Sequence, residues 1–204
     1  MAIITISRQF GSGGIDLGQR LAKRLKYDYV GKEIIDEIAK RVGVSTEGVM
    51  GFEKSGSTKM MDFIEKFIDK DFIKRHITEN HGYLDEKIYV TVIKDIFESL
   101  YKMGNVIIMG RGGQYILQNR ENTWHILIVG DMDSRVRNIM NRFQYTKEAA
   151  LREVKQADKN RLRFLNSLSV KNSHEDASSY DIILHMNRIS IKKAEDIITT
   201  LVSG

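Results

Sequence analysis

Ile3-Ile4-Thr5-Ile6-Ser7-Arg8-Gln9-Phe10-Gly11-Ser12-Gly13-Gly14-Ile15-Asp16 is the stretch that decides the fold. It predicts a short apolar strand, a glycine-rich turn, and a helix that continues to about Leu25. Glycines allow a sharp turn and the close approach of a ligand, and the N–H groups at the start of the helix point into that turn. The pattern is typical of a nucleotide-binding P-loop. The alternative is a tight strand-to-helix turn that binds nothing.

The turn departs from the standard P-loop sequence, G-x-x-x-x-G-K-S/T, in which the lysine reaches the phosphates and the hydroxyl holds magnesium. If Gly13 is the second glycine, Arg8 occupies the position of the first glycine. Gly14 then stands at the lysine position and Ile15 at the hydroxyl position. The candidate nucleotide-binding residues of this stretch are Ser7, Arg8, Gly11, Ser12, Gly13, Gly14, Ile15 and Asp16.

Composition bounds the kind of protein. The chain has 204 residues, of which 42% are hydrophobic and 29% charged, as in an ordinary globular protein with one sizeable core. No cysteine is present, which excludes disulfides, thiol nucleophiles and cysteine metal sites. Neither a bilayer-spanning apolar run nor a signal peptide is visible, so we expect a cytoplasmic protein without membrane contacts. The formal net charge of +5 suits nucleotides or other polyanions, or is only a solvated basic surface.

Strands and helices alternate along the chain. Strands are predicted at residues 3–6, 27–30, 105–109, 124–129 and 180–186. Helices are predicted at 17–25, 32–41, 85–102, 131–143, about 146–165 and from 190 onward. A further short helix is expected near 45–49. Between 61 and 72, methionines and phenylalanines recur at helical spacing, which indicates core packing or a surface that closes over a substrate base. The alternation predicts an α/β fold with a mainly parallel sheet, forming one domain over residues 1–204.

A second glycine-rich turn, residues 110–113, follows the apolar strand at 105–109. In open parallel sheets, ligands bind beyond the carboxyl ends of the strands, so this turn and the first one are expected at the same edge. Arg111 lies in this turn, where it contacts a phosphate or makes a structural ion pair. Lys155, Lys159 and Arg163 form a basic stripe on one helix face, a pattern that is usually only solvated.

Taken together, these segments resemble the cytidylate kinase-like family of P-loop nucleoside monophosphate kinases. The matching segments are residues 4–14, 32–35, 106–112, 158–161 and 180–184. The resemblance implies a three-layer fold with about five parallel strands and helices on both faces. It also implies a helical nucleotide-binding insertion at about 40–84 and a mobile lid at about 143–178.

The resemblance further implies a reaction. The γ-phosphoryl group of ATP, with Mg²⁺ as the metal, passes to a nucleoside monophosphate such as CMP or dCMP, or to another small acceptor. Arg111 matches the arginine that contacts the acceptor phosphate. Asp158, Arg161 and Arg163 match the lid group at the reacting centre. Because converging guanidinium groups suit phosphate geometry, we hypothesise that Arg8 substitutes for the absent lysine.

Other readings stay open. A nucleotide-binding regulator without catalysis would also lack the P-loop lysine. A nucleic-acid-binding protein is supported only by the basic charge, since aromatic residues are not interleaved with a basic patch. A serine hydrolase is excluded because Gly11-Ser12-Gly13 is not a G-x-S-x-G elbow. No residue is assigned as a metal ligand, and neither the acceptor nor the oligomeric state follows from the sequence.

Overall fold

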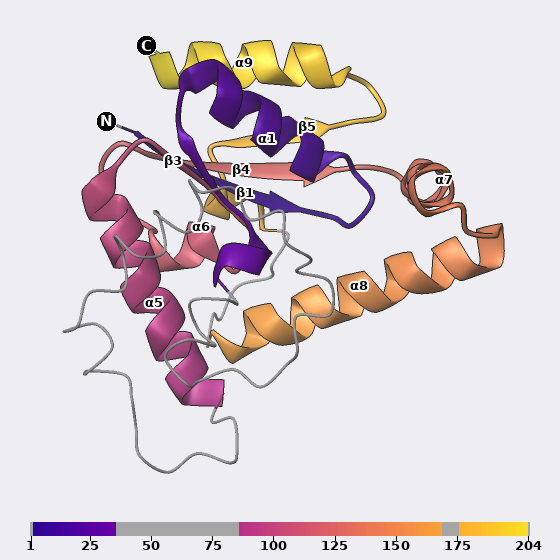
Figure 1. Ribbon diagram of the computed structural model, residues 1–204, viewed down its shortest axis with the longest axis horizontal. Coiled ribbons are helices and arrows are strands. Elements are labelled where there is room, and N and C mark those ends of the chain that lie inside the picture. The colour runs from indigo at the N-terminus through magenta and orange to yellow at the C-terminus, as the bar shows by residue number, and fades with distance from the viewer. Residues whose placement is uncertain (1, 36–85, 169–175, 204) are drawn as a thin grey trace. The chain divides into compact units, whose positions relative to one another are not determined.

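The computed structural model describes residues 2–35, 86–168 and 176–203 (Figure 1). The chain divides into two compact units, one of Met1–Tyr29 with Gly104–Gly204 and the other of Val30–Met103. The predicted short helix near 45–49, the apolar stripe at 61–72 and most of the 40–84 insertion lie outside the described residues. Within the second unit, residues 32–35 are helical and α5 spans Glu86–Met103.

The first unit is built on a five-stranded parallel sheet in the order β2-β3-β1-β4-β5, which confirms the predicted fold class. The strands are β1 (Ile3–Arg8), β2 (Asp28–Val30), β3 (Val106–Met109), β4 (Thr123–Val129) and β5 (Ile182–His185). Strand β1 is central, and Ile4 lies opposite Ile107 on one side and Trp124 on the other. The carboxyl ends of β1, β3 and β4 therefore share one edge of the sheet.

Helices cover both faces of this sheet (Figure 1). Helices α1 (Gly14–Leu25) and α9 (Ile191–Ser203) lie together on one face, and α6 (Gly113–Ile116) and α8 (Lys147–Ser167) lie on the other. Helix α7 (Met132–Phe143) follows the end of β4 and packs against α8. A short 3₁₀ helix, Ala177–Ser179, precedes β5.

The alternation of side chains along β1 assigns its two faces. Ile4 and Ile6 are fully buried in the core between the sheet, α1 and α9, where Leu17, Leu21 and Ile198 meet them. Because successive side chains of a strand point to opposite faces, Thr5 and Ser7 face the other way, and they are also buried. Polar side chains are thus placed inside the unit, next to the end of the central strand.

Helices α7 and α8 have a small core of their own. Val136 and Ile139 of α7 are buried against Ala150 and Val154 of α8, and Phe10, from the turn after β1, packs on this cluster. Thr146 caps α8 by accepting a hydrogen bond from the N–H of residue 149 at 3.2 Å. The glycine-rich turn is therefore anchored to the α7–α8 pair as well as to the sheet.

In the part of the chain that the structure describes, no helix combines the length and the apolar character needed to cross a bilayer.

Candidate functional site

The turn between β1 and α1 takes the conformation that its glycines allow. Gly11 and Gly13 have φ of +83° and +85°, values that favour glycine. The Ser12 hydroxyl is buried and donates to the carbonyl of Gln9 at 2.7 Å and to that of Ile128 at 3.3 Å. Ser12 therefore holds the turn in shape and attaches it to β4.

Helix α1 begins at Gly14 with no side chain capping its first turn. The N–H of Leu17 donates to the carbonyl of Gly13 at 3.2 Å, so the N–H groups of residues 14–16 precede the first intrahelical bond. Such groups, together with the helix dipole, favour an anion at this end of the helix.

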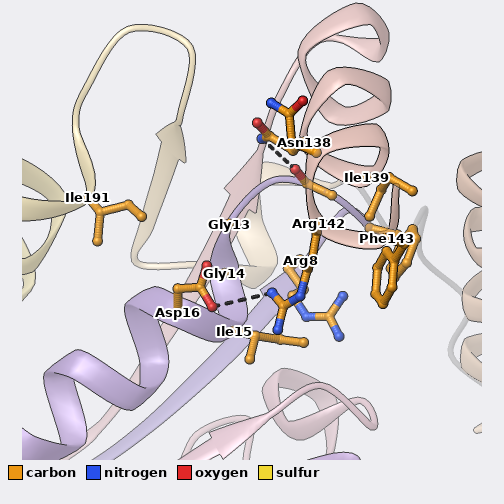
Figure 2. Close-up of a pocket in the computed structure, with 13 residues that line it drawn as sticks. Arg8, Gly13, Gly14, Ile15, Asp16, Asn138, Ile139, Arg142, Phe143 and Ile191 are labelled. Atoms are coloured by element: carbon orange, nitrogen blue, oxygen red, sulfur yellow. Dashed lines mark hydrogen bonds and ion pairs between the residues drawn. The ribbon is translucent and has the colours of Figure 1, made fainter. Parts of the chain in front are cut away.

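A pocket of about 550 Å³ opens beside this helix start (Figure 2). It is lined by Arg8, Phe10, Gly11 and residues 13–16, together with the last two turns of α7 and Ile191 at the start of α9. The apolar side chains of Ile139 and Phe143 lie beside Arg8 and Arg142, and Ile191 lines the pocket on the opposite side (Figure 2). The pocket therefore combines an apolar surface, on which a flat group could pack, with positive charge near the N–H groups of residues 14–16.

Arg8 enters this pocket across Gly14. A Cβ atom on Gly14 would lie 2.9 Å from Cδ and 3.1 Å from Cβ of Arg8. The side-chain stem of Arg8 therefore covers Gly14, the residue at the lysine position of the standard motif.

Arg142 and Asp16 face each other across the pocket, with 3.3 Å between Nη1 and Oδ1 (Figure 2). Each side chain is 51% exposed, so the ion pair contributes little to stability. Its consequence is local, because a cation from α7 offsets Asp16, the only carboxylate among the described residues that line the pocket.

Helix α7 also supports the turn from outside. The Arg135 guanidinium, 5% exposed, donates to the carbonyl of Phe10 at 3.2 Å and to both carboxylate oxygens of Asp158 at 2.9 to 3.0 Å. Asn138 donates from Nδ2 to the carbonyl of Gly11 at 2.9 Å. A Cβ on Gly11 would lie 2.7 Å from the Arg135 carbonyl oxygen, so the turn rests directly on α7.

Arg111 and Arg161 lie together on the opposite face of β1 from the core. Arg161 of α8 donates from Nη2 to the Ser7 hydroxyl at 3.1 Å. The Arg111 guanidinium stacks 4.8 Å above the ring of Phe164, one helical turn beyond Arg161. Arg111 has a φ of +53° between two glycines that also have positive φ, so the backbone of this turn is locally strained.

A polar cluster continues from this pair of arginines. Gln114, almost fully buried, donates to the Tyr180 hydroxyl at 3.1 Å. Burial raises the pKa of the Tyr115 phenol, the proximity of Tyr180 raises it further, and Arg161 acts weakly in the opposite direction. Tyr115 is therefore neutral and able to donate a hydrogen bond near pH 7.

The structure thus divides the predicted site residues into groups. Arg8, Gly11, Gly13, Gly14, Ile15 and Asp16 line the pocket, and Ser12 lies behind it. Ser7, Arg111 and Arg161 form the second group. Asp158 pairs with Arg135, and Arg163 lies exposed on α8, on a different side of the helix from Arg161. The roles assigned to these residues stay predictions.

Three residues of α7 were not predicted: Arg135, Asn138 and Arg142. Their spacing of three and four residues places them on one face of a helix. A polar stripe at helical spacing directly after a buried strand was the available signal, and it lay within a helix start that the sequence did predict.

The described residues contain no group of three or more histidine, cysteine or acidic side chains that could hold a metal ion.

Comparisons with known proteins agree with this geometry. The family model described as the cytidylate kinase-like family matches residues 3–188. The chain belongs to the cytidylate kinase-like family. A search of curated proteins finds no match.

Two of the solved structures that are similar to this member of the cytidylate kinase-like family illustrate its fold. One is an uncharacterized protein from Eubacterium ventriosum, at 21% identity and a TM-score of 0.72, with 100% of this chain and 99% of that chain covered. The other is a shikimate kinase from Bacteroides thetaiotaomicron, at 13% identity and a TM-score of 0.51, with the same coverage. These likenesses show the fold of a P-loop kinase.

Proposed function

We propose that the protein is a phosphotransferase that uses ATP as donor and a nucleoside monophosphate such as CMP or dCMP, or another small acceptor, as substrate. Membership of the cytidylate kinase-like family supports a kinase in general. The observation that carries the donor assignment is the pocket, in which glycine backbone, the start of α1 and Arg8 converge beside an apolar wall.

The pocket has parts that match the parts of ATP. The backbone N–H groups of residues 14–16 and the Arg8 guanidinium suit the phosphates. Ile139 and Phe143 offer apolar contacts to the base, and Arg142 can stack on a base or pair with a phosphate oxygen.

The acceptor is assigned to the other side of β1. Arg111 and Arg161 lie there with the hydroxyl groups of Ser7 and Tyr115, a set that suits a phosphate and neutral hydroxyls. Phosphoryl transfer needs donor and acceptor held in line, with the charge of the equatorial oxygens neutralised. Cations on both sides of the strand end would supply that neutralisation.

Magnesium is expected to arrive with the nucleotide. Ile15 replaces the motif hydroxyl, Ser12 donates to backbone carbonyls, and Asp16 pairs with Arg142. Mg²⁺ at kinase sites commonly keeps several waters and binds substrate phosphates, so it fits here through phosphate oxygens and water. When bound, it neutralises charge on the phosphates.

A nucleotide-binding regulator is the second candidate, favoured by the absence of both the lysine and the magnesium hydroxyl from the loop. It would use the same pocket without transfer.

One pair of measurements tests the proposal. Calorimetry with ATP and Mg²⁺ reports binding, and a coupled assay of ADP release against CMP, dCMP, UMP, AMP and small hydroxyl metabolites reports transfer. Arg8→Ala should weaken ATP binding by roughly 10- to 100-fold, since a charge-assisted contact contributes about 1.5–3 kcal/mol. Arg24→Ala, an exposed arginine at the far end of α1, is the matched control.

The outcomes separate the candidates. Transfer to one acceptor supports the phosphotransferase. ATP binding without release of ADP in any mixture supports the regulator. Absence of ATP binding, or equal binding by the wild type and Arg8→Ala, contradicts the donor assignment.

A further inference from the structure

Arg8 and Gly14 occupy two positions of the loop at which the residue types are the reverse of those in the standard P-loop motif. The standard motif has glycine at the first position and a cation at the second. This chain has the cation at residue 8 and glycine at residue 14. Four residues, 9–12, separate Arg8 from Gly13, as four residues separate the two glycines of the motif.

The structure gives this exchange a physical basis. A Cβ on Gly14 would lie 2.9, 3.1 and 3.5 Å from Cδ, Cβ and Cγ of Arg8. Three atoms of the stem, and not only its mobile tip, thus occupy the space of a side chain at residue 14. Gly14 has no positive φ that would itself require glycine. The reason for a glycine here is therefore the arginine.

We propose that Arg8 and Gly14 are energetically coupled: Arg8, at the end of β1, supplies the phosphate-binding cation in place of the motif lysine, and glycine at residue 14 leaves space for the Arg8 side chain. The phosphate-binding part of this inference rests on the proposed function. The coupling of the two residues does not, because it follows from their contact.

The exchange alters what the cation can do. A lysine at the start of the helix is a mobile point charge, whereas a guanidinium offers five N–H donors in a fixed plane and can bind two phosphate oxygens at once. Its stem lies against Gly14, in the first turn of α1. The guanidinium is therefore held at the pocket before any ligand arrives, which lowers the entropy lost on binding.

A double-mutant cycle on stability tests the coupling without any ligand. Gly14→Ala should lower the folding equilibrium constant by about tenfold or more, as overpacking does. In an Arg8→Gly background, which removes the stem, the same change should lower it less than about threefold, because Ala suits the start of a helix. Equal effects of Gly14→Ala in both backgrounds would overturn the coupling.

ADP binding with Mg²⁺ gives the second cycle. Arg8→Gly and Gly14→Ala should each weaken ADP binding by about tenfold or more, and the double variant should be no weaker than the worse single one. The inference is overturned if the losses of ADP affinity of the two single variants multiply in the double variant and Gly14→Ala also has the same effect on stability in both backgrounds. If the wild type binds no nucleotide, the proposed function fails, and the stability cycle alone decides the coupling.

A restored motif provides a gain-of-function test. Arg8→Gly with Gly14→Lys recreates the standard order of glycine and lysine, and should bind ADP at least tenfold more tightly than Gly14→Lys alone. Equal affinity of the two variants would contradict an exchange of roles. Gly18→Ala is the matched control, because its Cβ would meet Met109 Cε at 2.7 Å and Tyr29 Cε2 at 3.0 Å, away from the loop. It should reduce stability and leave ADP affinity unchanged.

Discussion

Removal of the Asp158 carboxylate should destabilise the protein more than removal of its partner, Arg135. Three N–H···O contacts of 2.9 to 3.0 Å join the two groups. The arginine side chain is 5% exposed and the aspartate 30% exposed. Only the carboxylate can therefore regain water when its partner is removed.

The magnitudes follow from this asymmetry. Asp158→Ala leaves a buried guanidinium without its counter-charge, which costs about 3–5 kcal/mol of the free energy of unfolding, and partial water entry favours the lower end. Arg135→Met keeps the apolar stem and leaves a carboxylate that water reaches, for a loss of about 1–2 kcal/mol. The double variant should lose about 2 kcal/mol, so the coupling energy is about 2 kcal/mol.

Urea unfolding followed by circular dichroism measures all four proteins of this cycle. Asp196→Ala, which removes an exposed partner of Arg24, serves as the control and should leave the free energy of unfolding nearly unchanged. The reasoning is refuted if Arg135→Met is the more damaging variant, or if the two losses simply add. Either result would mean that burial of the guanidinium does not govern the pair.

Two further predictions concern stability. Gly112→Ala should lose about 2–4 kcal/mol, because φ is +73° and the new Cβ would lie 2.1 Å from Leu168 Cδ1. Gly110→Ala, with φ of +74° and no atom of the described residues within 4 Å of the new Cβ, should lose only about 1 kcal/mol. Equal losses in thermal unfolding would contradict the contact. Burial lowers the pKa of His125 despite the attraction of Asp181. The folded-state pKa then lies below the unfolded value of about 6.5, so this contribution to stability is complete above the unfolded value and is lost as the pH falls below it and through the folded-state pKa. Unfolding at pH 5 to 8 should show a shallower slope for His125→Gln than for the wild type, and an unchanged slope would contradict the assignment.

The sheet was predictable because its strands carry strong local signals. The run at 105–109 is apolar throughout, as expected of a strand buried on both faces, and β3 lies at Val106–Met109. The last helix was predicted from residue 190 onward, and the hydroxyl of Ser190 accepts a hydrogen bond from the N–H of Lys193 at 3.2 Å. Burial pattern and capping act over a few residues, so one sequence is sufficient to detect them.

The contacts around the loop were less predictable because they join distant parts of the chain. Asp158 was assigned to the reacting centre by resemblance. The resemblance did not indicate that its carboxylate accepts hydrogen bonds from Arg135, 23 residues earlier and on another helix. Ser12 was a candidate nucleotide-binding residue from its place in the motif, and no local signal indicated that its hydroxyl donates to the carbonyl of Ile128 on a neighbouring strand. No local pattern reports such pairs, since they depend on how α7, α8 and β4 pack.

The loop receives its positive charge and its support from elements other than α1. Arg8 comes from β1, Arg142 from α7, and neither stands at the lysine position of the motif. Because Asn138 and Arg135 of the same helix also hold the carbonyls of Gly11 and Phe10, α7 determines both the shape of the turn and part of its charge. The absence of a lysine from the motif is therefore a poor guide to the charge of the pocket, since two guanidinium groups converge on the turn in three dimensions.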